Sequence, residues 1–179
     1  WIIGIGGFSF QVLSIVRSSG KYKERKFDFG GFIDTRKDMI QSVLDQNKKL
    51  LDGCEYKIAH DIEEVDLTCD KFVFGISDPN YKKHFIENNG LNSDHFEQLL
   101  PGVKSNIGNT ICKSILNETR LSTNVLIGDF NYIDLNCVIG HDCKIGNFNH
   151  IGVNVIIGGN VKIGNGCIIH SGAIIGQNA

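Results

Sequence analysis

Isoleucine recurs at every sixth position through the C-terminal part of the chain, nine times in succession. The nine positions are Ile127, Ile133, Ile139, Ile145, Ile151, Ile157, Ile163, Ile169 and Ile175. Glycine follows seven of them, and the residue four places after each is small and apolar in seven cases. A short strand with its isoleucine pointing inward, followed by a tight corner, satisfies this pattern. The repeat predicts a parallel β-solenoid whose coils stack at about 4.8 Å around an isoleucine column.

The same phase continues upstream through Ile115 and Leu121, so we expect the solenoid to begin near Asn109. The 71 residues from there to Ala179 would form about four coils of 18 residues. Terminal coils need a cap, and the repeat stops at Ala179 without one. Because the sequence also starts at Trp1, not methionine, we expect both of its ends to be incomplete.

The first hundred residues follow a different pattern, in which short apolar runs alternate with segments of helical spacing. The predicted strands lie within 1–7, 29–34 and 71–76, and the predicted helices within 8–20, 36–51 and 80–90. The helix at 36–51 would bury Met39, Ile40, Val43, Leu44 and Leu50. Alternating strands and helices favour a small parallel sheet. We therefore predict a Rossmann-like α/β domain over 1–104, a linker near 101–109 and the solenoid over 109–179.

A glycine turn, "GIGGFS" at residues 4–9, follows the first predicted strand. It lacks the third glycine of the dinucleotide fingerprint, so a purely structural turn is an equal alternative. In the functional interpretation, bare amides at the helix N-terminus hold a phosphate, and Asp34 at the end of the second strand accepts a sugar or base hydroxyl.

Charge, apolar runs and cysteine spacing exclude several classes of function. The net charge of −2 gives no field to attract nucleic acid or an anionic membrane, and no apolar run is long enough to cross a bilayer. Cys137, Cys143 and Cys167 fall on the small inward position, where reduced thiols pack as small hydrophobes. The other three cysteines show no CxxC spacing, which leaves no zinc knuckle or disulfide framework. Reduced cysteines and the lack of a secretory segment predict a cytoplasmic protein.

Three histidines interrupt the repeat. His141 lies two residues after Ile139, and His150 lies five after Ile145, so neither occupies an inward position. Solvated surface residues and site residues remain equal alternatives for this pair. His170 stands at a glycine position, where a structural or incidental role is favoured.

A glycine-turn α/β domain followed by hexapeptide coils containing "HDCKIGNFNHIG" resembles one family of sugar acetyltransferases. The family includes sialic acid O-acetyltransferases and N-acetyltransferases of nucleotide-linked 4-amino sugars, and the resemblance covers nearly the whole chain. It implies a left-handed β-helix, acetyl-CoA as co-substrate without a metal, and a homotrimer that holds the cofactor between coils of two subunits.

The resemblance also implies roles for single residues. His141 would be the general base, followed by its partner Asp142, while His150 and Gly159 would lie near the thioester. Nucleotide-sugar contacts would come from Gly6, Gly7, Asp34 and Gly75. Phe8 would also lie among these substrate contacts, but it replaces the histidine common in the family, so one polar contact to the substrate would be missing there.

The residue types suit this chemistry on their own. Imidazole is unprotonated near neutral pH and can take a proton from an attacking amine or hydroxyl, and a carboxylate can orient it. Neighbouring strand residues point to opposite faces, so a contact between His141 and Asp142 requires a corner. Backbone amides at Gly158 and Gly159 are candidates to stabilise a developing oxyanion.

The favoured function is N-acetylation of a nucleotide-linked amino sugar for surface glycan synthesis, with O-acetylation of sialic acid or another glycan sugar as the alternative. A non-catalytic scaffold remains a rival. A zinc carbonic anhydrase is disfavoured because the solenoid histidines lie nine and twenty residues apart, whereas that site has two histidines five apart.

Overall fold

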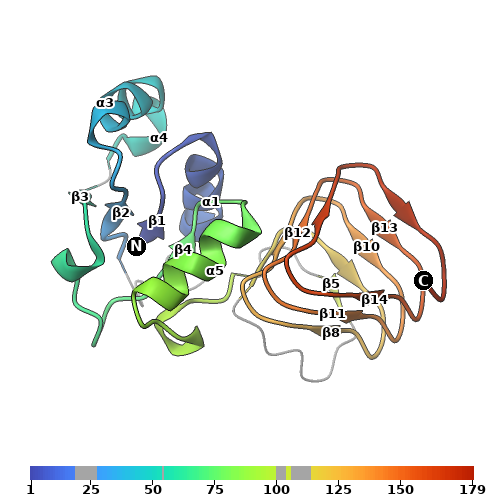
Figure 1. Cartoon of the computed structure of the whole chain (residues 1–179). Helices are drawn as coiled ribbons and strands as arrows, with labels where there is room; N and C mark the ends of the chain where they lie inside the picture. Colours follow the sequence, from blue (N-terminus) through green and yellow to red (C-terminus); the bar gives the residue numbers. More distant parts are fainter. Residues whose placement is uncertain (19–27, 54, 100–103, 106–113) are drawn as a thin grey trace. The chain divides into compact units, whose positions relative to one another are not determined.

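The computed structural model describes residues 1–18, 28–53, 55–99, 104–105 and 114–179 (Figure 1). Contacts divide the chain into two compact units, residues 1–77 with 86–97, and residues 78–85 with 98–179. The division falls within helix α5 (Pro79–Asn88), whose first residues group with the solenoid. The boundaries expected from the sequence, 104 and 109, stay a prediction. The predicted helix end at Gly20 and the solenoid start near Asn109 lie outside the described residues.

The first unit contains a parallel sheet in the order β3-β2-β1-β4, which confirms the predicted α/β class (Figure 1). Its strands are β1 (Ile2–Ile3), β2 (Gly31–Ile33), β3 (Lys57–Ala59) and β4 (Val73–Phe74). Its helical segments are α1 (Gly7–Ser18), α3 (Lys37–Gln46), α4 (Lys48–Leu51), η1 (Ile62–Glu64) and η2 (Ser93–His95). Phe32 in β2 is fully buried and lies 5.4 Å from the ring of Phe10 in α1, so these aromatic rings fasten helix to sheet.

Two parts of this unit differ from the sequence-based prediction. Strand β3 was not predicted, and it pairs closely with Gly31, whose φ is 141° and whose position leaves no room for a Cβ against the Lys57 carbonyl. The helix predicted over 36–51 is two helices, because Asn47 turns its side-chain amide onto the Val43 carbonyl at 2.8 Å and ends α3.

The predicted apolar face of this helix is confirmed only in part. In the structure only Ile40 of α3 and Leu51 of α4 are buried. Met39 and Leu50 are 55% and 45% exposed. Val43 and Leu44 are half-buried, so the apolar face is only partly covered.

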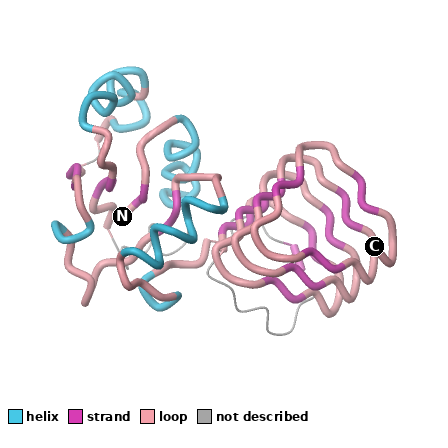
Figure 2. Tube along the Cα trace, viewed as in Figure 1, coloured by secondary structure: helices cyan, strands magenta, loops and turns pink. Residues whose placement is uncertain are grey.

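The second unit is a left-handed parallel β-helix, as predicted (Figure 2). Its two-residue strands are β5 (Lys104–Ser105), β6 (Ile115–Leu116), β7 (Arg120–Leu121), β8 (Leu126–Ile127), β9 (Tyr132–Ile133), β10 (Val138–Ile139), β11 (Lys144–Ile145), β12 (His150–Ile151), β13 (Ile156–Ile157), β14 (Lys162–Ile163), β15 (Ile168–Ile169) and β16 (Ile174–Ile175). They form three parallel sheets, and from β7 onward each strand pairs with the strand 18 residues on, as Val138 pairs with Ile156. One coil therefore takes three hexapeptides. The first two strands pair over shorter steps, β5 with β7 over 16 residues and β6 with β9 over 17, so the predicted phase through Ile115 is off by one residue.

The inside of the solenoid holds the predicted column. The isoleucines from Ile127 to Ile157 are buried, the later ones are partly buried, and Cys137 and Cys143 are buried beside them as expected. The glycines after Ile127, Ile139, Ile145, Ile151 and Ile157 stack closely on the next coil, since a Cβ at Gly140 would lie 2.6 Å from the carbonyl carbon of Gly158. These glycines therefore allow coils to stack, whereas a Cβ at Gly164 or Gly176 would meet nothing within 4 Å.

The corners depend on a different residue, the third after each isoleucine. The left-handed non-glycine residues of the solenoid are Glu118, Asn124, Phe130, Asn136, Asp142, Phe148, Asn154, Asn160 and Asn178, with φ between 46° and 67°. Apart from glycine, asparagine and aspartate are the residues that adopt the left-handed conformation most readily, so their recurrence at the corners fits the backbone.

Within the described ranges, no helix combines the length and apolar character needed to span a bilayer.

Candidate active site

The predicted pair His141 and Asp142 lies at a corner between β10 and β11. Asp142 has a φ of 61°, which turns its side chain back toward the preceding residue. His141 Nδ1 and Asp142 Oδ2 are 2.7 Å apart, so the corner supplies the contact that a straight strand would forbid. The imidazole is 52% exposed, and it stands outside the isoleucine column. The hydrogen bond from His141, followed by one from Asn124, holds the pKa of Asp142 below its usual value.

Gly159 lies against the other end of the same imidazole. A Cβ at this position would be 2.5 Å from His141 Nε2, so only glycine leaves room for the observed ring position. The N–H of Asn160 donates to the His141 carbonyl at 2.7 Å, which fixes the two coils at this point.

The two glycine amides are not equivalent. The N–H of Gly158 donates to the Ile175 carbonyl at 2.8 Å and is part of the stacking between coils. Gly159 donates no backbone hydrogen bond within the described part of the chain. The N–H of Gly159 is therefore the one open to a ligand, and a direct contact from Gly158 would require breaking a bond between coils.

His150 lies on a different side of the solenoid, in β12, between Tyr132 and Ile168 of the neighbouring coils. Its ring is half-buried, with its centre 5.4 Å from that of Tyr132. The pKa of His150 is lowered, mainly by burial and further by the charge of Lys82. The charge of Asp134 opposes this shift but does not cancel it. These causes favour a neutral ring that can hydrogen-bond to a ligand without carrying charge.

Lys82 is a buried cation that the sequence did not reveal. It extends from α5 and is 2% exposed, and its Nζ donates to the carbonyl of Phe130 at 3.2 Å. Phe130 occupies a left-handed corner and stacks on Phe148 of the next coil, with ring centres 5.0 Å apart. Burial lowers the pKa of Lys82 to about 8, although Asp78 raises it. Lys82 thus fastens the start of α5 to the solenoid.

This burial predicts a rise in stability above neutral pH. The unfolded chain keeps the Lys82 proton up to about pH 10.4, whereas the folded chain releases it near pH 8. The unfolded state therefore binds more protons between these values, and the free energy of unfolding should rise by up to about 3 kcal/mol across them. Denaturant unfolding of wild type and Lys82→Met between pH 7 and 10.5 measures this, and we expect the variant to lose the rise.

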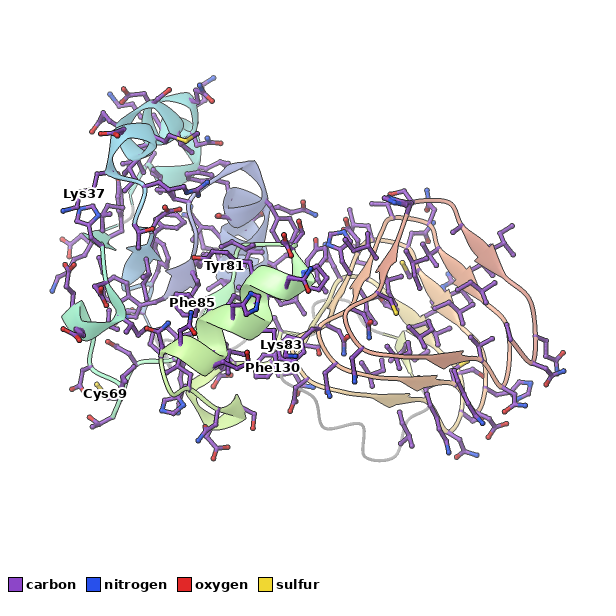
Figure 3. All side chains as sticks on the ribbon, viewed as in Figure 1. Lys37, Cys69, Tyr81, Lys83, Phe85 and Phe130 are labelled. Carbon is purple, nitrogen blue, oxygen red and sulfur yellow. The ribbon has the colours of Figure 1, made fainter. Side chains whose placement is uncertain are left out.

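Lys83→Met is the matched control, because Lys83 is the exposed neighbour on α5 (Figure 3). It should keep the wild-type rise. Equal pH dependence in all three proteins would show that the Lys82 proton is not linked to folding.

Asp34, predicted to meet the substrate, is buried and already engaged within the first unit. Its carboxylate accepts hydrogen bonds from the N–H of Ile5 at 2.7 Å and from Arg36 Nε at 2.9 Å. Burial opposes ionisation, but these bonds and the Arg36 charge outweigh it and hold the pKa of Asp34 below its usual value. Asp34 therefore ties the glycine turn to the end of β2, and the half-exposed guanidinium of Arg36 is the group at this edge that sequence reasoning missed.

The other predicted contacts of this unit lie around the start of α1. Gly7 begins the helix and is exposed, Gly6 precedes it, and a Cβ on either would meet nothing within 4 Å. The first amides of a helix point out of its end, so this turn fits an anion. Phe8 is half-buried in the first turn. Gly75 packs against Ser9, where a Cβ would lie 2.7 Å from Ser9 Oγ, and this packing explains the glycine without a ligand.

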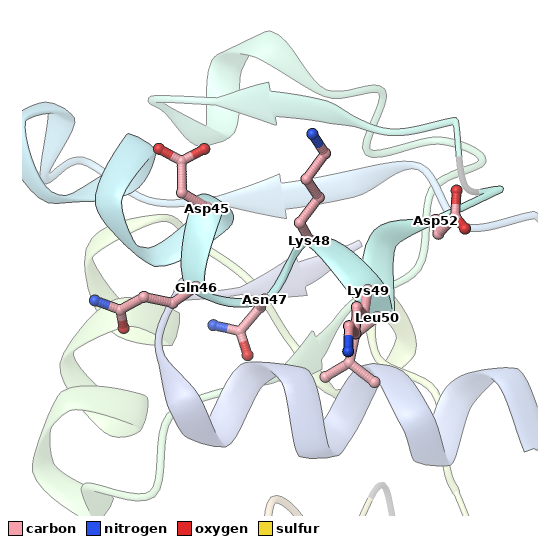
Figure 4. A pocket seen from close by; sticks show the side chains of 7 residues that line it. All are labelled: Asp45, Gln46, Asn47, Lys48, Lys49, Leu50 and Asp52. Atoms are coloured by element: carbon pink, nitrogen blue, oxygen red, sulfur yellow. The ribbon is translucent and has the colours of Figure 1, made fainter.

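The molecule also has a surface depression of about 550 Å³ around the α3–α4 break (Figure 4). Its lining residues are Asp45, Gln46, Asn47, Lys48, Lys49, Leu50 and Asp52. None of the predicted site residues is among them. In the described part of the chain, no group of three or more histidine, cysteine, aspartate or glutamate side chains is placed to hold a metal ion.

The repeat and the fold define a class of protein. Residues 142–177 match the bacterial transferase hexapeptide family (six repeats). The α/β unit with a hexapeptide solenoid is also the fold of two solved structures, one of them a perosamine N-acetyltransferase, in agreement with the predicted resemblance. No curated protein sequence matches the chain.

Two solved structures carry the comparison. WeeI from Acinetobacter baumannii AYE is 19% identical, with a TM-score of 0.62, over 98% of this chain and 87% of that one. A histidine-to-asparagine mutant of perosamine N-acetyltransferase from Caulobacter crescentus, solved with CoA and GDP-perosamine, is 18% identical. Its TM-score is 0.64, and the match covers 99% of this chain and 82% of that one. At such identities the likeness establishes the fold.

Proposed function

We propose that this protein transfers an acetyl group from acetyl-CoA to a sugar, with His141 as general base. The observation that carries the proposal is the corner where Asp142 holds one nitrogen of the imidazole and the bare backbone of Gly159 adjoins the other. A base needs one nitrogen fixed and the other open to the reacting group. Both conditions are met at this half-exposed ring.

The roles of the residues follow from this arrangement. Asp142 fixes the His141 tautomer by accepting from Nδ1, so that Nε2 is the atom that takes the proton of the attacking amine or hydroxyl. Acetyl-CoA supplies the acetyl group as an activated thioester. The N–H of Gly159 is the candidate donor to the carbonyl oxygen of that group, and the neutral ring of His150 is the candidate contact near the thioester.

The finer proposal is that the acceptor is the amine of a nucleotide-linked amino sugar. The glycine turn before α1, with Gly6 and Gly7, suits a phosphate, and Arg36 beside Asp34 adds a cation at the same edge of the sheet. The neighbour solved with CoA and GDP-perosamine acts on a substrate of this class. Asp34 contributes by holding the turn, and Phe8 and Gly75 by shaping its packing.

We also propose that the protein forms a homotrimer. Val138, Ile156 and Ile174 follow one another in register on the outside of a single sheet, and all three are exposed, Ile174 by 75%. A continuous exposed apolar column of this kind marks a protein interface. The cofactor would then lie between coils of two subunits. A cytoplasmic location stays a prediction.

The test is acetyl transfer to a panel of acceptors. UDP-, GDP- and dTDP-linked amino sugars and free sialic acids are offered with acetyl-CoA, and release of the free thiol is followed. We expect turnover with at least one nucleotide-linked amino sugar. Turnover with sialic acid alone would favour O-acetylation. Absence of both acetyl-CoA binding and turnover would favour a scaffold and contradict the proposal.

A further inference from the structure

The corner that carries Asp142 belongs to a column of stacked corners spaced by 18 residues. Asn124 lies one coil before Asp142, with a φ of 55° against 61°. The two corners are joined by the backbone, because the N–H of Asp142 donates to the Thr123 carbonyl at 2.9 Å. The side chains of Asn124 and Asp142 therefore project from equivalent positions of adjacent coils.

The two side chains are hydrogen-bonded. Asn124 Nδ2 donates to Asp142 Oδ1 at 3.0 Å, while the other oxygen, Oδ2, faces His141 Nδ1 at 2.7 Å. A carboxylate that accepts on both oxygens has a fixed plane, whereas a carboxylate held on one oxygen can rotate. Asn124 thus controls the orientation of the group that orients the imidazole.

We infer that Asn124 is a positioning residue for the base, acting through Asp142. The inference rests on the proposed function, since it assigns Asn124 to the reaction of that site. The bond to Asn124 also contributes to the lowered pKa of Asp142, which keeps this group a carboxylate. A purely structural bond between coils would need no carboxylate partner.

The solenoid offers an internal comparison. Asn136 donates to Asn154 Oδ1 at 2.7 Å across the same 18-residue step, from a left-handed corner with φ of 59°. Its partner is an amide and adjoins no histidine in sequence. Substitutions at Asn136 therefore reproduce the structural cost of losing an amide bond between corners, without touching the base.

Two substitutions at Asn124 test the inference. Glycine and aspartate both accept a left-handed φ, so Asn124→Gly and Asn124→Asp should leave the corner folded. Asn124→Gly removes the donor, and Asn124→Asp opposes Asp142 with a second carboxylate, so both should raise the pKa of Asp142. We expect kcat to fall about 10- to 100-fold while KM for both substrates is unchanged.

A second readout is the pH profile. The residues of the adjoining coils that contact this turn, Thr123, Asn124, Gly159 and Asn160, are uncharged, so the ionisable groups here are His141 and Asp142 themselves. The carboxylate added in Asn124→Asp should therefore favour the protonated imidazole and move the acidic limb of kcat to higher pH. Asn136→Gly and Asn136→Asp should keep the wild-type kcat, KM and profile.

The Asp142 carboxyl is titrated by NMR in all five proteins, which needs no turnover. A raised Asp142 pKa with reduced kcat in the Asn124 variants supports the inference. Wild-type titration and kcat in these variants, or equal losses in the Asn136 variants, would overturn it. If wild type acetylates no acceptor, the proposed function fails, and the titration still decides whether Asn124 holds Asp142.

Discussion

His141→Gln should reduce acetyl transfer by about 10² to 10⁴, the range that a positioned general base contributes. Glutamine can occupy the space beside Gly159 and donate to Asp142, but its amide cannot take a proton from the acceptor. The loss should therefore fall on kcat, with acetyl-CoA binding close to that of wild type. Steady-state kinetics by thiol release and calorimetric titration of CoA measure the two effects separately.

His170→Gln is the control for this experiment. His170 is exposed on a later coil of the same solenoid, at the position that holds glycine in most repeats. It should keep full turnover, and both variants should keep the wild-type mass by light scattering. Full turnover in His141→Gln would show that another group removes the proton.

The solenoid could be predicted from the sequence because its interior admits so few side chains. Each rung has one inward strand residue and one small residue, so the isoleucine period records the geometry directly. The sequence also carries a signal for the corners, as asparagine or aspartate at Asn124, Asn136, Asp142 and Asn160. An 18-residue comparison of these positions places Asn124 and Asp142 at equivalent corners of adjacent coils, and the structure adds the bond between them.

The α/β unit was harder to predict in detail. Strand β3 has only three residues, and Lys57 is exposed, so no apolar run marks it. The feature that marks its pairing is Gly31 in β2, where the Lys57 backbone of β3 comes too close to leave room for a Cβ. The burial of Lys82 depends on where α5 meets the solenoid corner at Phe130, and residues so far apart in sequence leave no local pattern. Tertiary contacts decided both features.

Gly159→Ala should reduce kcat by about 10², because the new methyl group displaces the imidazole of His141 from its reacting position. The protein should stay folded. The new methyl group would lie 2.5 Å from His141 Nε2, a distance no carbon and nitrogen can hold without a shift. The atoms it meets belong to the end of a rotatable side chain, and Gly159 is not left-handed, so the ring moves and the coil does not. The carboxylate contact at Nδ1 would be lost with the same rotation.

Gly164→Ala separates this effect from the general cost of adding a methyl group to the solenoid. A Cβ at Gly164 would meet nothing within 4 Å, and its φ is also outside the left-handed region. We expect this control to match wild type in kcat and thermal midpoint, and Gly159→Ala to match it in thermal midpoint alone. Because the substitution keeps His141 and Asp142, a large loss of kcat would show that the position of the imidazole, set by the bare backbone of the next coil, is what the reaction requires. Wild-type kcat in Gly159→Ala would mean that the ring reacts from a different position, and the assignment of Gly159 to the site would fail.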